Sequence, residues 1–157
     1  MHHNGQNFTC HTILPGDPAF RGRGMAISYG YHRMPAGKIL LAQSGGRLCY
    51  LGFAVDGDKD IPLKEMKAHF PRAQLTADDD DTAMVERVVN AWCGRRGGID
   101  IELHGTPFQI SVWRALLEIP FGKAVSYRDI AAQIGMPKAA RAVGGAVGAN
   151  PVSLLVP

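Results

Sequence analysis

The chain has 157 residues, 46% of them hydrophobic and 20% charged, which is typical of a globular protein that buries a core. No apolar run approaches a membrane span and the first ten residues lack the apolar segment of a secretory signal, so we expect a cytoplasmic protein. Three cysteines, far apart, match neither a disulfide framework nor zinc-finger spacing, so no bound metal is expected. The net charge of +3 falls entirely on the segment from His104 onward, which permits a polyanionic partner.

The first half of the chain carries the pattern of an antiparallel sheet. Residues 1–22 are rich in glycine, proline and histidine without periodicity, which predicts an irregular lead-in. The segments 25–34, 37–43 and 46–55 alternate apolar with small or polar residues and are separated by turn residues. This pattern predicts a meander of three antiparallel strands.

Two helices and a further strand are predicted next. A short helix over 62–70 begins at a proline and ends before another, and a second helix over 82–93 shows an apolar stripe. Residues 99–103 predict one more strand. Cys49 and Cys93 both stand among apolar residues, so we expect both to be buried.

From His104 onward the pattern becomes helical. Thr106 and Gln109 form a capping-box pattern at the start of one helix. A second helix begins after Ser126 and ends at Gly135, and a third begins at Pro137. The last two helices are joined by a short turn, which predicts a helix-turn-helix.

The elements together predict an α+β fold in three parts. They are an irregular lead-in over residues 1–22, an α/β domain with a three-stranded antiparallel sheet over 23–103, and a helical domain over 104–157.

The helix predicted over 139–149 is built almost entirely from alanine, glycine and valine, and only Arg141 is long and polar. Glycine within a helix costs about 1 kcal/mol relative to alanine, so a close approach to another surface should offset it. Tight packing against a neighbouring helix is the simpler interpretation. The alternative is a helix pressed into the narrow minor groove of DNA, with Arg141 filling the space left by an extruded base.

Residues 126–157, SYRDIAAQIGMPKAARAVGGAVGANPVSLLVP, resemble the DNA-binding and active-site region of the O6-alkylguanine-DNA alkyltransferases, also called methylated-DNA–protein-cysteine methyltransferases. The similarity is close over 105–157 and looser over 25–103. It implies a ribonuclease H-like N-terminal α/β domain and a C-terminal winged helix-turn-helix domain.

The resemblance also implies the activity and the partner. Members of this family repair DNA by direct damage reversal: they flip an alkylated guanine out of the duplex and transfer the alkyl group irreversibly to a protein cysteine, in a single turnover and without a cofactor. The implied partner is double-stranded DNA containing O6-alkylguanine, bound through the minor groove with little sequence specificity. A monomer in the bacterial cytosol or nucleoid is expected.

The resemblance assigns roles to individual residues. Arg141 matches an arginine finger that enters the base stack, and Tyr127 matches a tyrosine that helps rotate the phosphodiester and can donate a proton to the purine. Asn150 matches a hinge asparagine before the nucleophile, and Ser153 and Pro157 would line the pocket for the base. From the residues alone, Arg141 could instead contact a phosphate or form a salt bridge, Tyr127 could be a core aromatic, and Asn150 could be a turn residue. The helix surface facing the phosphates would be formed by Ala139, Ala140, Ala142 and Gly144.

The family's nucleophile is a cysteine in a Pro-Cys-His-Arg sequence, directly after a strand that matches 152–156, and the sequence ends at Pro157. Cys10, Cys49 and Cys93 do not match that position. We therefore expect the chain as printed not to transfer alkyl groups, and a shortened form of an active alkyltransferase is the favoured interpretation. The alternatives are a non-catalytic alkyltransferase-like protein that binds lesions, and a winged-helix regulator, against which the alanine and glycine helix argues.

Overall fold

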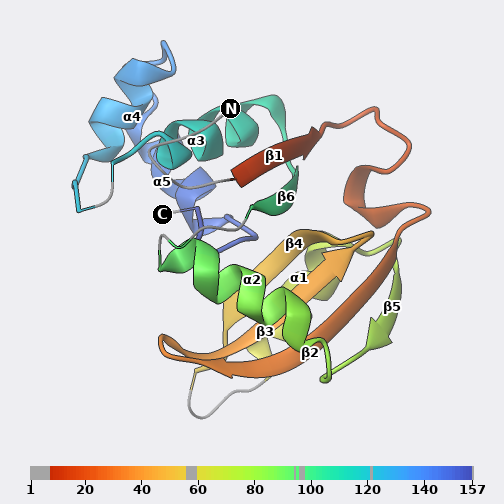
Figure 1. Ribbon diagram of the computed structural model, residues 1–157. Helices are drawn as coiled ribbons and strands as arrows, with labels where there is room; N and C mark the ends of the chain where they lie inside the picture. Colours follow the sequence, from red (N-terminus) through yellow and green to blue (C-terminus); the bar gives the residue numbers. More distant parts are fainter. Residues whose placement is uncertain (1–7, 56–59, 94, 96–97, 121, 157) are drawn as a thin grey trace.

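The computed structural model describes residues 8–55, 60–93, 95, 98–120 and 122–156. They form one six-stranded sheet, in the order β1-β6-β4-β3-β2-β5, and five α-helices (Figure 1). The strands are β1 (Phe8–Ile13), β2 (Ala26–Met34), β3 (Gly37–Ser44), β4 (Arg47–Phe53), β5 (Gln74–Ala77) and β6 (Ile99–His104). The helices are α1 (Ile61–His69), α2 (Thr82–Trp92), α3 (Pro107–Leu117), α4 (Tyr127–Gln133) and α5 (Ala140–Gly148), with a short 3-10 helix over Phe20–Gly22. This mixture of helices and sheet confirms the expected α+β class.

The centre of the sheet is the predicted meander. β2 pairs with β3 and β3 with β4, both antiparallel. Successive residues of β3 point to opposite faces, as a strand requires: Ile39 and Leu41 join one apolar cluster, and Leu40 and Ala42 join the other. All four side chains are buried, so the sheet is covered on both faces.

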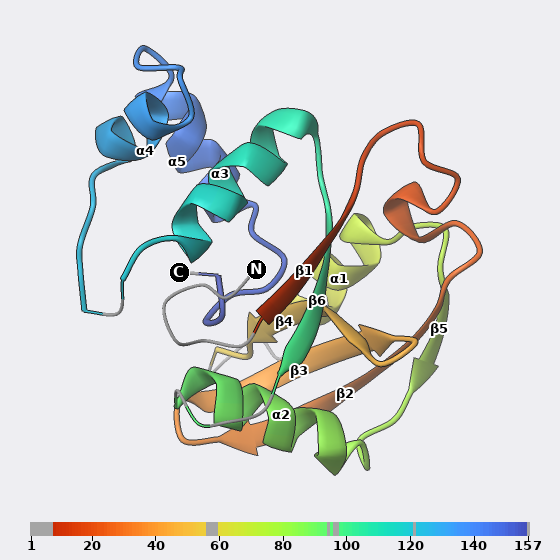
Figure 2. The same cartoon turned by 45° about the horizontal axis from the view of Figure 1, so that its top comes forward.

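The sheet is larger than the three strands predicted for it, because it continues beyond the meander at both ends, and β6 is the further strand predicted over 99–103. On one side β6 lies next to β4, and β1 pairs in parallel with β6, with Cys10 opposite Ile101 (Figure 2). Residues 8–13 of the expected irregular lead-in are therefore a strand. On the other side β5 pairs in parallel with β2. β6 and β5 thus satisfy backbone groups at the two edges of the meander, on β4 and β2, and β1 does the same at the outer edge of β6.

The helices cover the two faces of the sheet unequally. In Figure 1, α1 lies behind the sheet and α2 in front of it, and α3, α4 and α5 gather at one end. Met66 of α1 packs in the smaller cluster with Ile27 and Phe70. The larger cluster combines residues before and after position 103, among them Leu51, Trp113 and Val143. The expected division at 103/104 therefore runs through a shared core.

In the second half of the chain, α3 and α4 begin at the predicted capping residues. α3 begins with a complete capping box between Thr106 and Gln109, and α4 begins with another between Ser126 and Asp129. α4 is followed by Gly135, whose φ of +74° is the left-handed conformation that glycine adopts most readily.

The predicted start of the last helix at Pro137 is wrong, since α5 begins at Ala140. The backbone turns first, and the N–H of Ala139 donates to the carbonyl of Met136 (2.8 Å). A proline fixes a φ that suits both a helix start and a turn, so the sequence pattern fits either.

The buried strand expected over 152–156 is also wrong, although burial itself was correctly anticipated for Val152, Leu155 and Val156. Only Val152 pairs with the sheet, in an isolated parallel bridge to Leu51. The chain then turns through Leu154, which has a φ of +79°, and the N–H of Val156 donates back to the carbonyl of Val152 (3.1 Å).

Candidate nucleic-acid interface

Helix α5 presents a surface that is almost free of side chains. Val143 and Ala146 are buried, whereas Arg141, Ala142 and Gly145 are exposed. Gly148 is exposed as well, so Arg141 is the only long side chain on the exposed side of this nine-residue helix, all of which the structure describes. A surface can therefore approach the α5 backbone closely, next to one cation.

The inner side of α5 is fixed by Trp113 of α3. The indole Nε1–H of this fully buried residue donates to the carbonyl of Ala146 (2.8 Å). Ala146 lies in the last turn of α5, where carbonyl groups lack partners within the helix. Gly105 makes room for the ring, because a Cβ at this position would lie 2.6 Å from it. The small residues of α5 thus serve packing on one side and leave the other side bare.

Tyr127 is the first residue of α4, and its side chain does not lie in the core. It is 51% exposed, and its ring packs against Gly144 of α5. The structure thus brings two of the predicted residues together. Gly144 is half-buried beneath the ring, and Gly145 takes the open position on the surface where Gly144 was expected.

Asn150 follows α5 and holds the segment after it. Its side-chain Nδ2 donates to the carbonyl of Val156 (2.7 Å), and its Oδ1 accepts from the N–H of Val152 (2.9 Å). Ser153 is half-buried, and its N–H donates to the carbonyl of Leu51 in the sheet (3.1 Å). The proposed pocket residue Pro157 lies outside the described residues.

An open cavity of about 560 Å³ lies between this segment and the sheet. Asn150 and Pro151 line one side of it, and the start of α3 lines another. Neither Tyr127 nor Arg141 is among the described residues that line the cavity. Arg141 lies seven positions before Gly148, the last residue of α5, which is roughly 10 Å along the helix. Arg141 and Tyr127 therefore lie on the exposed α4–α5 surface, and Asn150 lines the cavity at the end of α5. Ser153, which was predicted to line the pocket for the base, is not among the described residues that line this cavity.

A polar network built on the buried Glu102 and His104 adjoins this cavity. Glu102 accepts from Nη1 of Arg47 (3.1 Å) and pairs with Nε2 of His104 (2.9 Å). The bond to His104 is the main reason that the pKa of Glu102 lies below its ordinary value. Burial, followed by the nearby charges of His104 and Arg21, lowers the pKa of His69 to about 4, so this ring is neutral at pH 7.

This network was not predicted from the sequence. The only signal was the spacing of Glu102 and His104, two apart on a strand and hence on the same face.

The cysteines of the described part are free, and they differ in exposure. Burial raises the pKa of both Cys10 and Cys49, which makes a reactive thiolate harder to form. Cys93 is exposed, so its expected burial was wrong. It directly follows α2, and because the helix has ended there, Cys93 does not lie on the buried face formed by Met84, Val88 and Ala91.

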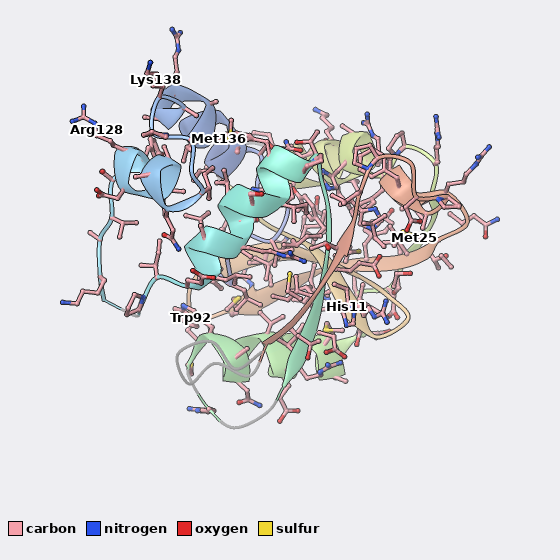
Figure 3. All side chains as sticks on the ribbon, turned by 90° about the horizontal axis from the view of Figure 1, so that it is seen from above. His11, Met25, Trp92, Arg128, Met136 and Lys138 are labelled. Carbon is pink, nitrogen blue, oxygen red and sulfur yellow. The ribbon has the colours of Figure 1, made fainter. Side chains whose placement is uncertain are left out.

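Cations dominate the exposed end of the helical part. Lys123, Arg128, Lys138 and Arg141 are all exposed, and Figure 3 shows Arg128 and Lys138 projecting away from the sheet. Asp129 is occupied by the α4 cap, and hydrogen bonds from Ser126 keep its pKa below the ordinary value. Within the described ranges, no cluster of histidine, cysteine or acidic residues is suited to hold a metal ion, and no helix has the length and apolarity to span a membrane.

Comparison with known proteins agrees with this arrangement. Residues 107–157 match the family described as 6-O-methylguanine DNA methyltransferase, DNA binding domain. The methylated-DNA–protein-cysteine methyltransferase of Haemophilus influenzae is 33% identical over 132 residues, which are 84% of this chain and 71% of that protein. The chain belongs to the methylated-DNA–protein-cysteine methyltransferase family. The resemblance noted in the sequence is thereby confirmed.

Two further members of the methyltransferase family show how far the likeness extends. The inducible enzyme of Bacillus subtilis is 40% identical over 113 residues, which are 68% of this chain but only 63% of that protein. The chain thus spans less than two thirds of this relative. A crystal structure of Mycobacterium tuberculosis OGT in complex with DNA has a TM-score of 0.64 and 34% identity, over 83% of this chain and 74% of that one.

Proposed function

We propose that this chain binds double-stranded DNA through the minor groove, as a monomer and without a cofactor, and flips out an O6-alkylated guanine for direct repair. The observation that carries the proposal is the exposed surface of α5, where Arg141 stands alone among alanine and glycine. In this proposal α4 and α5 act as the two helices of a winged helix-turn-helix, and the sheet is a ribonuclease H-like scaffold behind them.

The bare surface of α5 suits the minor groove better than the major groove. Reading the major groove requires several long polar side chains that reach base edges, and α5 exposes only Arg141. The minor groove is only about 6 Å wide, so small residues favour close approach there. A single arginine at the start of the helix can then enter the stack and replace the extruded base.

Tyr127 and Asn150 would act before and after extrusion. The half-exposed Tyr127 lies on the α4–α5 surface, where its hydroxyl can reach a phosphodiester or the purine. Asn150 fixes the segment beside the cavity through its two backbone hydrogen bonds. We assign lesion recognition and base extrusion to the residues of this chain, and alkyl transfer to a cysteine that the family places directly after Pro157.

The proposal is tested by comparing Arg141→Ala with Arg128→Ala. Both variants remove one exposed cation from the helical end. Affinity is measured by fluorescence anisotropy for a duplex containing O6-methylguanine and for the same lesion in a single strand, where no base has to be extruded. Because opening a base pair costs a few kcal/mol, Arg141→Ala should weaken duplex binding about tenfold or more and single-strand binding about twofold.

The control variant should behave differently. If Arg128 contacts only phosphates, Arg128→Ala weakens binding to both DNAs by similar factors. The slope of log affinity against log salt concentration then falls by about one, as expected for the loss of one phosphate contact. Equal losses for Arg141→Ala on both DNAs would refute the wedge. Failure of the unmodified chain to prefer the lesion duplex over undamaged duplex would refute the proposed function itself.

A further inference from the structure

Gly144 is the glycine of α5 that touches another side chain. A Cβ built on it would lie 3.0 Å from Cε2 and 3.2 Å from Cδ2 of Tyr127. Cβ atoms built on Gly145 and Gly148 meet nothing within 4 Å. Three glycines of one short helix therefore stand in two different surroundings, and only Gly144 faces the ring.

Alanine would suit the helix at position 144 better than glycine, by about 1 kcal/mol. The nearby Tyr127 ring disfavours alanine, because the ring would have to move by a few tenths of an ångström to make room for the added Cβ. Tyr127 is 51% exposed, so its ring has room to move outward. The glycine therefore affects where the ring lies much more than whether the protein folds.

The backbone of Tyr127 is fixed separately. The side chain of Ser126 accepts from the N–H of Asp129 (3.2 Å), and the carboxylate of Asp129 accepts from the N–H of Ser126 (2.9 Å). This capping box sets the first turn of α4, which Tyr127 begins. The ring is thus held from two sides, by the α4 cap at its backbone and by α5 at its edge.

Gly144 also lies one helical turn after Arg141. Residues three apart on a helix are neighbours, with about 5–6 Å between their Cβ positions. The contact at Gly144 therefore places the Tyr127 ring next to the turn that carries Arg141. The two side chains proposed to act on the flipped nucleotide come from different helices, and this contact joins them.

We propose that Gly144 is a positioning residue for Tyr127: the absent Cβ lets the ring pack against α5 and so fixes its hydroxyl relative to Arg141. This inference rests on the proposed function. In catalysis a misplacement of about 1 Å can cost about a hundredfold, so a displacement of a few tenths corresponds to a loss of about threefold to fivefold.

The test compares Gly144→Ala with its neighbour Gly145→Ala in the full chain. The chain is labelled with 3-fluorotyrosine, and the Tyr127 resonance is assigned by its loss in Tyr127→Phe. Gly144→Ala should shift this ¹⁹F resonance, and Gly145→Ala should leave it in place. The second measurement uses 2-aminopurine beside O6-methylguanine in a duplex, at saturating protein, so that fluorescence reports extrusion within the bound complex.

Gly144→Ala should lower the lesion-dependent fluorescence about threefold to fivefold. Gly145→Ala adds a methyl group to the proposed DNA-facing surface, so it serves as the control for the ¹⁹F resonance alone. Thermal unfolding of both variants verifies that they are folded. An unmoved Tyr127 resonance in Gly144→Ala, or a resonance that Gly145→Ala shifts equally, would overturn the inference.

A double-mutant cycle separates action through Tyr127 from a direct effect on DNA. Tyr127→Phe keeps the ring but removes the hydroxyl, so Gly144→Ala should cause no further loss of extrusion in that background. If Gly144→Ala lowers extrusion by the same factor in the wild-type and in the Tyr127→Phe backgrounds, Gly144 acts independently of Tyr127, and the inference is overturned. If the unmodified chain gives no lesion-dependent fluorescence, the proposed function fails. If it gives that signal and the cycle is multiplicative, only the role of Gly144 fails.

Discussion

Replacing Asn150 with alanine measures how firmly the segment after α5 is held. The change removes two hydrogen bonds, to Val152 (2.9 Å) and Val156 (2.7 Å). A hydrogen bond contributes about 0.5–1.5 kcal/mol net, so the pair corresponds to about 1–3 kcal/mol. Val152 and Val156 are 0% and 1% exposed, so water cannot readily replace the lost partner. We therefore expect a loss near the upper end, about 2–3 kcal/mol.

The assay is urea denaturation combined with hydrogen exchange of the Val152 amide. Asn90→Ala is the matched control, since Asn90 is half-buried on α2 and, within the described part of the chain, its side chain makes no hydrogen bond. Its replacement should change stability by less than about 0.5 kcal/mol. Asn150→Asp keeps the acceptor for Val152 but turns an oxygen toward the Val156 carbonyl, so it should destabilise at least as much as alanine.

The reasoning fails if Asn150→Ala costs no more than Asn90→Ala. It also fails if the Val152 amide exchanges at the same rate in the wild-type chain and in Asn150→Ala. Either result would mean that the bridge between Leu51 and Val152 holds the segment without the side chain of Asn150.

Two further substitutions probe the surroundings of the cavity. Gly105→Ala should destabilise the chain by about 1–3 kcal/mol in urea titration, because its Cβ would lie 2.6 Å from the buried Trp113 ring; a variant as stable as wild type would contradict this packing. The pKa of His69 is about 4 in the folded chain and about 6.5 in the unfolded chain, so only the unfolded chain gains a proton between these values. Stability should fall, by up to about 3 kcal/mol, as the pH decreases from 6.5 to 4. His69→Leu should remove most of this dependence, and an unchanged pH profile in urea titration would show that another group is responsible.

The elements that follow local rules could be predicted from the sequence. The caps of α3 and α4 depend on side chains three residues apart, and the meander depends on alternation and turn residues. In the site, Arg141 is singled out by the sequence because it is the only long polar residue in its helix. Such signals lie within a few positions of one another.

The features that could not be predicted depend on contacts between distant segments. β1 and β5 are strands because an edge of the sheet is available to them; they have only six and four residues, so the alternation in their sequences is too short to predict a strand. The turn at Leu154 follows from the bonds of Asn150, which replace an extended strand. The packing of Tyr127 on Gly144 joins two helices and is visible only when both are placed.

The shared core has a consequence for modularity. Trp113 and Val143 of the helical part pack in the same apolar cluster as Leu51 of the sheet, and the Val152 bridge adds a backbone link. Cutting the chain after residue 103 would expose that cluster on both pieces, so neither piece would keep its native stability alone. Folding and unfolding should therefore proceed as one cooperative transition. A recombinant DNA-binding half that begins at the helical part would need the sheet supplied in trans.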